Sequence, residues 1–174
     1  MDIDVSYIKK SMNDYRETNR AVERFVKSLV KECCSDLDAL MSKINVAVED
    51  VDNPITDEEL DYFILNLPIQ VYHAYEQSEM IGLAEDMAKQ KKSSAYAEAY
   101  SADVGTIAER KQYAELAVKN HQVLVSIYNR AGKQIRAKLD MATEMLQSLK
   151  KVSTRRMAEN AMENSSFRKN RGEF

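Results

Sequence analysis

The chain has 174 residues, of which 44% are hydrophobic and 30% charged, with only four glycines and two prolines. This composition excludes a disordered chain, and the scarcity of turn-forming residues argues against a β-sandwich or a dinucleotide-binding fold. The net charge of −3 conceals a strong segregation, since residues 44–88 carry eleven acidic and no basic side chains, whereas residues 89–174 carry seventeen basic and nine acidic ones. The acidic part argues against a general nucleic-acid coat, and the basic half allows a local binding face.

The first predicted element is a long helix over residues 4–50. From Val5 to Cys33 apolar residues recur at steps of three and four, which is the pattern of a helical seam. Beyond Cys33 the pattern changes phase to Leu37, so the helix is either continuous with a stutter or broken near Asp36. A seam of this kind predicts self-association. The residues expected to mediate it are Asn19, Val22, Val26 and Leu29.

The second predicted section is a linker at residues 51–55 followed by two helices. Thr56 and Glu59 have the spacing of a capping box, which marks the start of a helix. Pro68 predicts a helix end, because the residue before a proline is disfavoured in the helical region, and it suits the first turn of a new helix. The expected helices are 57–66 and 69–102, with Ile69, Tyr72, Leu83 and Met87 on one side of the second.

The third section is a helix–turn–helix junction at residues 103–106. Gly105 interrupts the preceding helix, and Thr106 with Glu109 repeats the capping-box spacing. A last helix is therefore expected over residues 106–152. Its apolar seam is Ala114, Ala117, His121, Leu124, Tyr128, Ala131 and Ile135, then Leu139, Ala142, Leu146 and Leu149.

The predicted fold is all-α, an elongated and mostly antiparallel helical bundle with coiled-coil character. We expect one domain over residues 1–152 and a frayed basic tail over 153–174. The start of the chain lacks the layout of a signal peptide, and no run of apolar residues is long enough to span a membrane. Adjacent helical cysteines, Cys33 and Cys34, are poorly placed to form a disulfide with each other, which favours a reducing compartment. The expected location is the cytoplasm, or the host cytoplasm if the protein is viral.

Residues that could carry out catalysis or bind a metal form no recognisable set. His73 and Glu76 are three apart, but di-metal bundles need more such pairs in the opposite order. A solvated or hydrogen-bonded histidine is the simpler interpretation, and Cys33 is read as a small core residue on the seam. The sequence therefore predicts neither an enzyme, a metal site nor a cofactor.

Lysine and tyrosine residues gather around the junction. Bases stack on aromatic rings while cations bind phosphates, so these residues could form a face for single-stranded DNA. Alternatively, the tyrosines fill space between alanine-rich helices. A second basic group near the end of the last helix also suits the helix dipole. The candidate nucleic-acid-binding residues are Lys91, Lys92, Tyr96, Tyr100, Arg110, Lys111, Lys150, Lys151, Arg155 and Arg156.

The acidic segment 44–88 also contains aromatic and aliphatic residues at 62–65. The simpler interpretation is a solvated helix face beside a core. The functional interpretation is a docking surface for a basic partner, or a mimic of the charge of nucleic acid.

The order KKSSAYAEAY, VGTIAERKQYAE and LQSLKK resembles helical proteins of phage recombination gene clusters. It is similar in layout to the UvsY-type phage recombination mediators over residues 62–152. The resemblance implies an oligomer that binds single-stranded DNA and helps to load a recombinase or annealing protein. Lys91, Lys92, Tyr96, Tyr100 and the end of the last helix would lie at matching positions. The acidic segment and the first long helix depart from that pattern. A phage-encoded inhibitor of a host nucleic-acid enzyme and a structural coiled-coil adaptor therefore stay open as alternatives.

Overall fold

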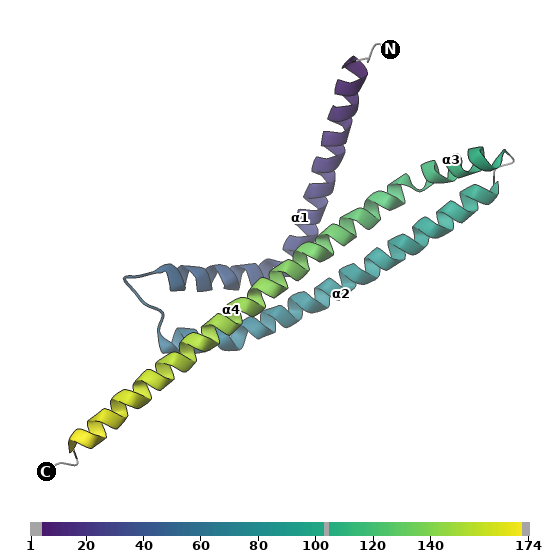
Figure 1. The fold of residues 1–174 in the computed structure, drawn as a ribbon. Coiled ribbons are helices and arrows are strands. Elements are labelled where there is room, and N and C mark those ends of the chain that lie inside the picture. Colours follow the sequence, from purple (N-terminus) through teal and green to yellow (C-terminus); the bar gives the residue numbers. More distant parts are fainter. Residues whose placement is uncertain (1–4, 103–104, 172–174) are drawn as a thin grey trace. The chain divides into compact units, whose positions relative to one another are not determined.

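The fold is all-α, as predicted. The computed structural model describes residues 5–102 and 105–171, and the side chains of residues 16–102 and 105–162. These residues form four helices and no strand, namely α1 (Val5–Glu49), α2 (Asp57–Ala102), α3 (Ile107–Ala117) and α4 (Lys119–Arg171) (Figure 1). None of the described helices is both long and apolar enough to cross a membrane.

The three long helices contribute to two compact units. Unit 1 consists of Met1–Cys33 and Glu76–Arg136, and unit 2 consists of Cys34–Tyr75 and Ala137–Phe174. A helix of 45 residues or more is too long for one small core to cover, because each residue adds about 1.5 Å of length. Successive stretches of α1, α2 and α4 therefore bury their apolar residues in separate cores.

Helix α1 buries one face, but the phase of that face differs from the prediction. Val22 and Val26 are buried as expected, whereas Leu29 and Cys33 are only half-buried and Asn19 is exposed. The sequence permits both phases because apolar residues stand in adjacent pairs at 29–30 and 33–34, and packing selects the second member of each pair. The helix is also unbroken at this point. The buried residues that follow Val26 are Val30, Cys34, Leu37, Leu40, Met41 and Ile44.

Helix α2 continues through Pro68, where the sequence predicted a boundary between two helices. An internal proline removes one backbone hydrogen bond and costs about 3 kcal/mol. Burial offsets this cost, because apolar side chains seven residues apart, among them Leu60 and Leu67, share one buried face that only an unbroken helix keeps aligned. The side-chain Nδ2 of Asn66 also donates a hydrogen bond to the Tyr62 carbonyl oxygen, 2.8 Å away, in the turn before the proline.

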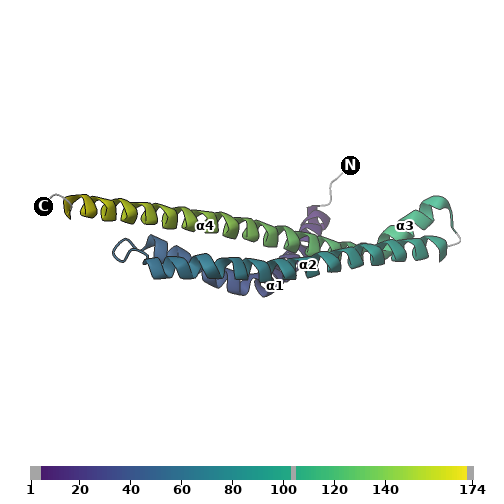
Figure 2. The same ribbon diagram turned by 90° about the horizontal axis from the view of Figure 1, so that it is seen from below.

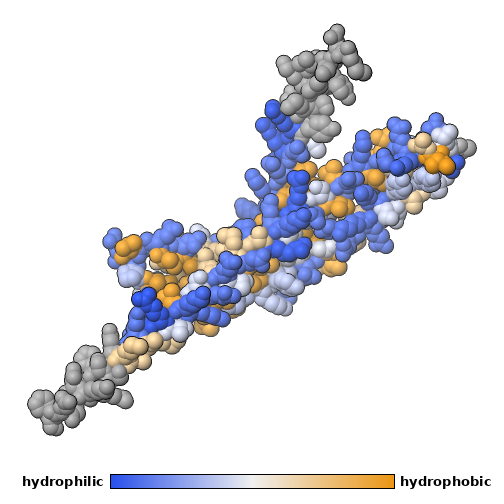
Figure 3. Space-filling view, in the orientation of Figure 1, coloured by the Kyte–Doolittle hydropathy of each residue, from blue (hydrophilic) through white to orange (hydrophobic). Residues whose placement is uncertain are grey.

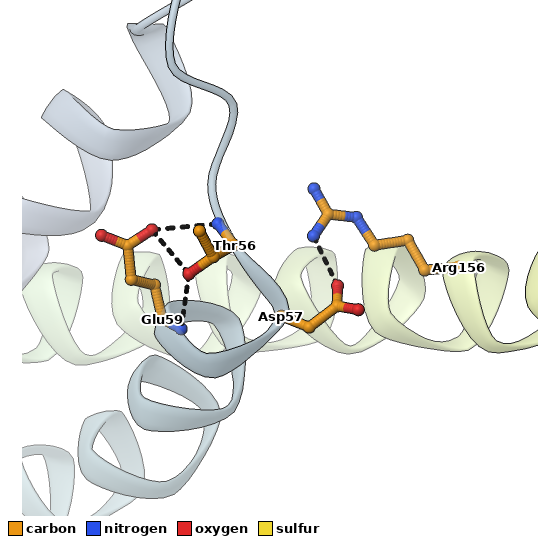
Figure 4. Close-up of polar contacts among 4 residues, drawn as sticks. All are labelled: Thr56, Asp57, Glu59 and Arg156. Carbon is orange, nitrogen blue, oxygen red and sulfur yellow. Dashed lines mark hydrogen bonds and ion pairs between the residues drawn. The ribbon is translucent and has the colours of Figure 1, made fainter.

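The helix starts agree with the predicted capping boxes. The Thr56 hydroxyl accepts a hydrogen bond from the Glu59 amide at 3.2 Å, and the Glu59 carboxylate accepts one from the Thr56 amide at 2.9 Å (Figure 4). Thr106 and Glu109 form the same reciprocal pair at the start of α3. These bonds satisfy backbone donors that have no partner within the helix. Part of the predicted junction, residues 103–104, lies outside the described residues.

Replacing Thr106 with alanine should lower the free energy of unfolding by about 1 kcal/mol, because the amide that its hydroxyl satisfies loses its acceptor. Urea unfolding followed by circular dichroism measures this change. Thr154→Ala is the matched control, since the Thr154 hydroxyl only donates to the Lys150 carbonyl within a helix. Equal effects of the two substitutions would show that the Thr106 cap does not contribute.

The last predicted helix is divided and extended. It breaks at Val118 into α3 and α4, which explains why Ala117 and Leu124 of the predicted seam are exposed while Val118 is buried. From Ala131 to Leu149 the predicted seam is largely confirmed. Helix α4 then continues to Arg171 through the region predicted to fray.

Candidate nucleic-acid interface

The candidate interface lies in unit 1, where α2 ends and α3 begins. Figures 1 and 2 both show α3 beside the end of α2. Ala99 of α2 and Ala114 of α3 are buried, and Ala114 has no exposed surface. Alanine is small enough to let helix backbones approach closely, so larger side chains are displaced to the edges of the contact.

Tyr96 and Tyr100 are such side chains. One helical turn separates them, and their rings stack with centroids 6.2 Å apart and planes inclined by 12°. Both residues are half-buried. Partial burial is compatible with both interpretations of the sequence, a binding face and a filler between helices, so both stay predictions.

The cations around the tyrosines differ in their surroundings. Lys91 and Lys111 are exposed, and Lys92 is half-buried. Arg110 is held at the turn because its Nε donates to the Gly105 carbonyl oxygen at 2.8 Å, which uses only one of the five N–H groups of a guanidinium. The structure thus places six candidate residues in one unit, and we call them the lysine–tyrosine face. They are Lys91, Lys92, Tyr96, Tyr100, Arg110 and Lys111.

The backbone conformation does not demand glycine at Gly105, since the described glycines all have negative φ, but the space around it is limited. A Cβ atom at this position would lie 2.8 Å from the Glu109 Oε2 atom. The capping carboxylate therefore occupies the space that a larger residue would need. The same carboxylate accepts bonds from Thr106, which lower the pKa of Glu109, first through the backbone amide and then through the hydroxyl.

The second predicted basic group belongs to unit 2 and is partly neutralised. Arg155 pairs with Glu159 at 2.8 Å, and Arg156 pairs with Asp57 at 2.7 Å (Figure 4). Lys150 and Lys151 are exposed. These four residues thus belong to a different unit from the first basic group, and two of them already have carboxylate partners.

The residues predicted for self-association take different positions in unit 1. Val22 and Val26 are buried within the chain itself, Leu29 is half-buried and Asn19 is exposed. The first part of that seam, residues 5–15, lies outside the described side chains. Self-association through α1 stays a prediction, although its central valines already contact other parts of this chain.

Metal binding and cysteine reactivity both lack support among the described residues. No three of their histidine, cysteine, aspartate or glutamate side chains cluster as metal ligands would. Cys34 rather than Cys33 is the fully buried thiol, and neither forms a disulfide. Burial, followed by the charge of Glu32, raises the pKa of the Cys33 thiol, which disfavours the nucleophilic thiolate.

The sequence interpretation missed a buried polar group in unit 1. Of the charged side chains that the structure describes, only Glu85 is buried. Its carboxylate accepts hydrogen bonds from Lys89 at 2.9 Å and from Asn129 at 3.1 Å. The sequence did contain a sign of this burial. Buried residues recur every seven positions from Leu60 and Leu67 onward, and Glu85 lies next to the helix face that they form.

The fold and this site together define an all-α protein with a lysine–tyrosine face at a helix–turn–helix junction. Comparisons with protein-family models, with curated proteins and with solved structures gave no match.

Proposed function

We propose that this protein is a non-enzymatic accessory factor of phage-type recombination that binds single-stranded DNA through the lysine–tyrosine face of unit 1. The observation that carries the proposal is the parallel pair of half-exposed rings, Tyr96 and Tyr100, with Lys91 and Lys92 one turn before them. The resemblance to recombination mediators supports the biological setting. The oligonucleotide and a recombinase or single-strand-binding protein are the proposed partners.

The chemistry of the face suits single strands better than duplexes. Base stacking on an aromatic ring is worth about 1–3 kcal/mol per base and needs no particular sequence, but it requires bases that are not already paired and stacked. Cations on both sides of the turn can then neutralise successive phosphates. Lys89 contributes less to such a surface, because it already pairs with Glu85 and Asp86.

Binding of a labelled oligonucleotide at several salt concentrations tests the proposal. Replacing both Tyr96 and Tyr100 with alanine should weaken binding about 10- to 100-fold, because stacking is lost, and leave the salt dependence nearly unchanged. The matched control replaces both with phenylalanine, which keeps the rings and should keep most of the affinity. Circular dichroism checks that each variant remains helical.

The lysines should affect the salt dependence instead. Replacing Lys91 and Lys92 with alanine should flatten the slope of log K against log salt by roughly one to two units, at about 0.7 per phosphate. Lys119→Ala with Lys133→Ala, exposed lysines of α4, is the control and should flatten it less. Absence of wild-type binding even at low salt would overturn the proposal, as would loss of helix in the alanine variant, since the tyrosines would then be structural. Tight binding to a basic protein without DNA binding would favour the inhibitor alternative.

A further inference from the structure

Helix α2 carries a second apolar surface, in unit 2, on the side away from its core. Its residues follow one another at steps of three and four, and each is more than half exposed. We call them the α2 stripe. They are Tyr62 (51%), Leu65 (69%), Ile69 (51%), Tyr72 (60%) and Tyr75 (55%). Ile69 is two residues from buried Leu67 and hence roughly 200° around the helix from it. Single exposed apolar residues are ordinary on a protein surface, but a continuous stripe of large ones marks a contact surface.

The first residue of the stripe lines a surface cavity. Tyr62 and Phe63 line a surface cavity of about 560 Å³ together with residues from the end of α1, among them Val46 and Ala47. Figure 3 shows apolar side chains gathered where α1 ends and α2 begins. A partner helix laid along the stripe could insert a side chain there, and such inserted anchors contribute much of the energy of protein interfaces.

Charge restricts the kind of partner. Residues 44–88 contain no basic side chain, and Glu58 and Asp61 stand exposed at the start of the stripe. Two copies of the stripe placed face to face would bring like charges together, which is unfavourable in a desolvated contact. The stripe therefore fits a helix with apolar residues and cations on one face.

The end of α4, also in unit 2, is such a helix. Beyond Leu149 no residue is buried up to Met162, the last residue with a described side chain. Lys151, Val152 and Arg155 are exposed and project from one side, and Met162 recurs on it at helical spacing. Half-buried Ser153 and Arg156, which pairs with Asp57, lie on the other side of this helix, so the side with Lys151 is open to a partner.

We infer that the end of α4 from a second copy of this chain docks on the α2 stripe, with Lys151 facing its acidic residues and Val152 and Met162 covering its apolar ones. The contact joins two different surfaces, so each copy presents one of each kind. It lies in unit 2 and does not depend on DNA binding in unit 1. It also differs from the α1 seam, whose valines are used within the chain.

Analytical ultracentrifugation tests this contact. The wild type should sediment as a dimer or larger species. Leu65→Ser with Ile69→Ser should sediment as a monomer, and so should Lys151→Glu with Arg155→Glu. An equimolar mixture of the two variants should form a complex, because one supplies an intact α4 end and the other an intact stripe. Val51→Ser is the control, since Val51 is 90% exposed but lies outside the stripe.

Three outcomes would overturn the inference. One is a wild type that is monomeric at every concentration. Another is assembly that survives both double substitutions, or that changes only with Asn19→Leu, which would assign the contact to α1. The third is two monomeric variants that form no complex when mixed, because the stripe would then bind a different partner. Circular dichroism of each variant excludes unfolding as the cause of any loss.

Discussion

Replacing Leu67 with alanine should lower the free energy of unfolding by about 2–5 kcal/mol. Leu67 has no exposed surface, and it stands directly before the proline that the sequence predicted as a helix boundary. Removing its side chain loses apolar burial and leaves a cavity in unit 2. The effect should be large because the same side chain also holds the two halves of α2 on one buried face across Pro68.

The measurement is urea unfolding of the wild type and the variant, followed by circular dichroism. Leu83→Ala is the matched control on the same helix, since Leu83 is 59% exposed and its removal should cost less than about 1 kcal/mol. Should the two substitutions cost the same, Leu67 would not be a core residue, and its burial would not hold α2 together across Pro68.

Glu85→Gln should cost about 1–3 kcal/mol of stability at neutral pH. The substitution keeps the size of the side chain but removes the negative charge that strengthens the bonds from Lys89 and Asn129. Hydrogen bonds to a charged group contribute more than neutral ones, and Glu85 is buried whereas its partner Lys89 is half exposed.

The stability cost of Glu85→Gln should decrease as the pH falls. The bond from Lys89, followed by that from Asn129, lowers the pKa of Glu85 below its ordinary value of 4.5. The stabilisation is therefore complete above pH 4.5 and is lost as the pH falls through the lowered value, because the unfolded state takes up the proton first. The difference between the wild type and the Gln variant should accordingly shrink in acid.

Unfolding curves at neutral pH and at pH values below 4.5 measure this difference. Asp86→Asn is the matched control, since Asp86 is the adjacent carboxylate, 74% exposed, and also contacts Lys89. It should have little effect at any pH. A cost of Glu85→Gln that stays constant or grows in acid would contradict the assigned role of the charge.

Local sequence signals predicted the helical class and the two helix starts that carry a capping box. The two threonine–glutamate pairs act through atoms three residues apart, so they need nothing from the rest of the chain. The scarcity of glycine and proline similarly left few places for turns. The neighbouring positions of Tyr96 and Tyr100 were also predictable, because residues four apart on a helix share a side whatever packs against them.

Packing decided what local signals left ambiguous. Adjacent apolar pairs in α1 allowed two seams, and only contact with other helices selected Val30 and Cys34 over Leu29 and Cys33. At Pro68 the local preference was for a break, and burial of Leu67 on a shared face outweighed it. Burial energy depends on distant residues, which a local pattern does not contain.

The sequence by itself thus determined the two capped helix starts at Thr56 and Thr106, which residues share a helix side, and how charge divides along the chain. Only the tertiary structure decided which side of each helix is buried. In α2 this leaves Ile69 and Tyr72 in an exposed stripe and Glu85 in a buried position. The physical reason is that a helix with two apolar sides gains similar energy from burying either one, so its partners determine which side faces water.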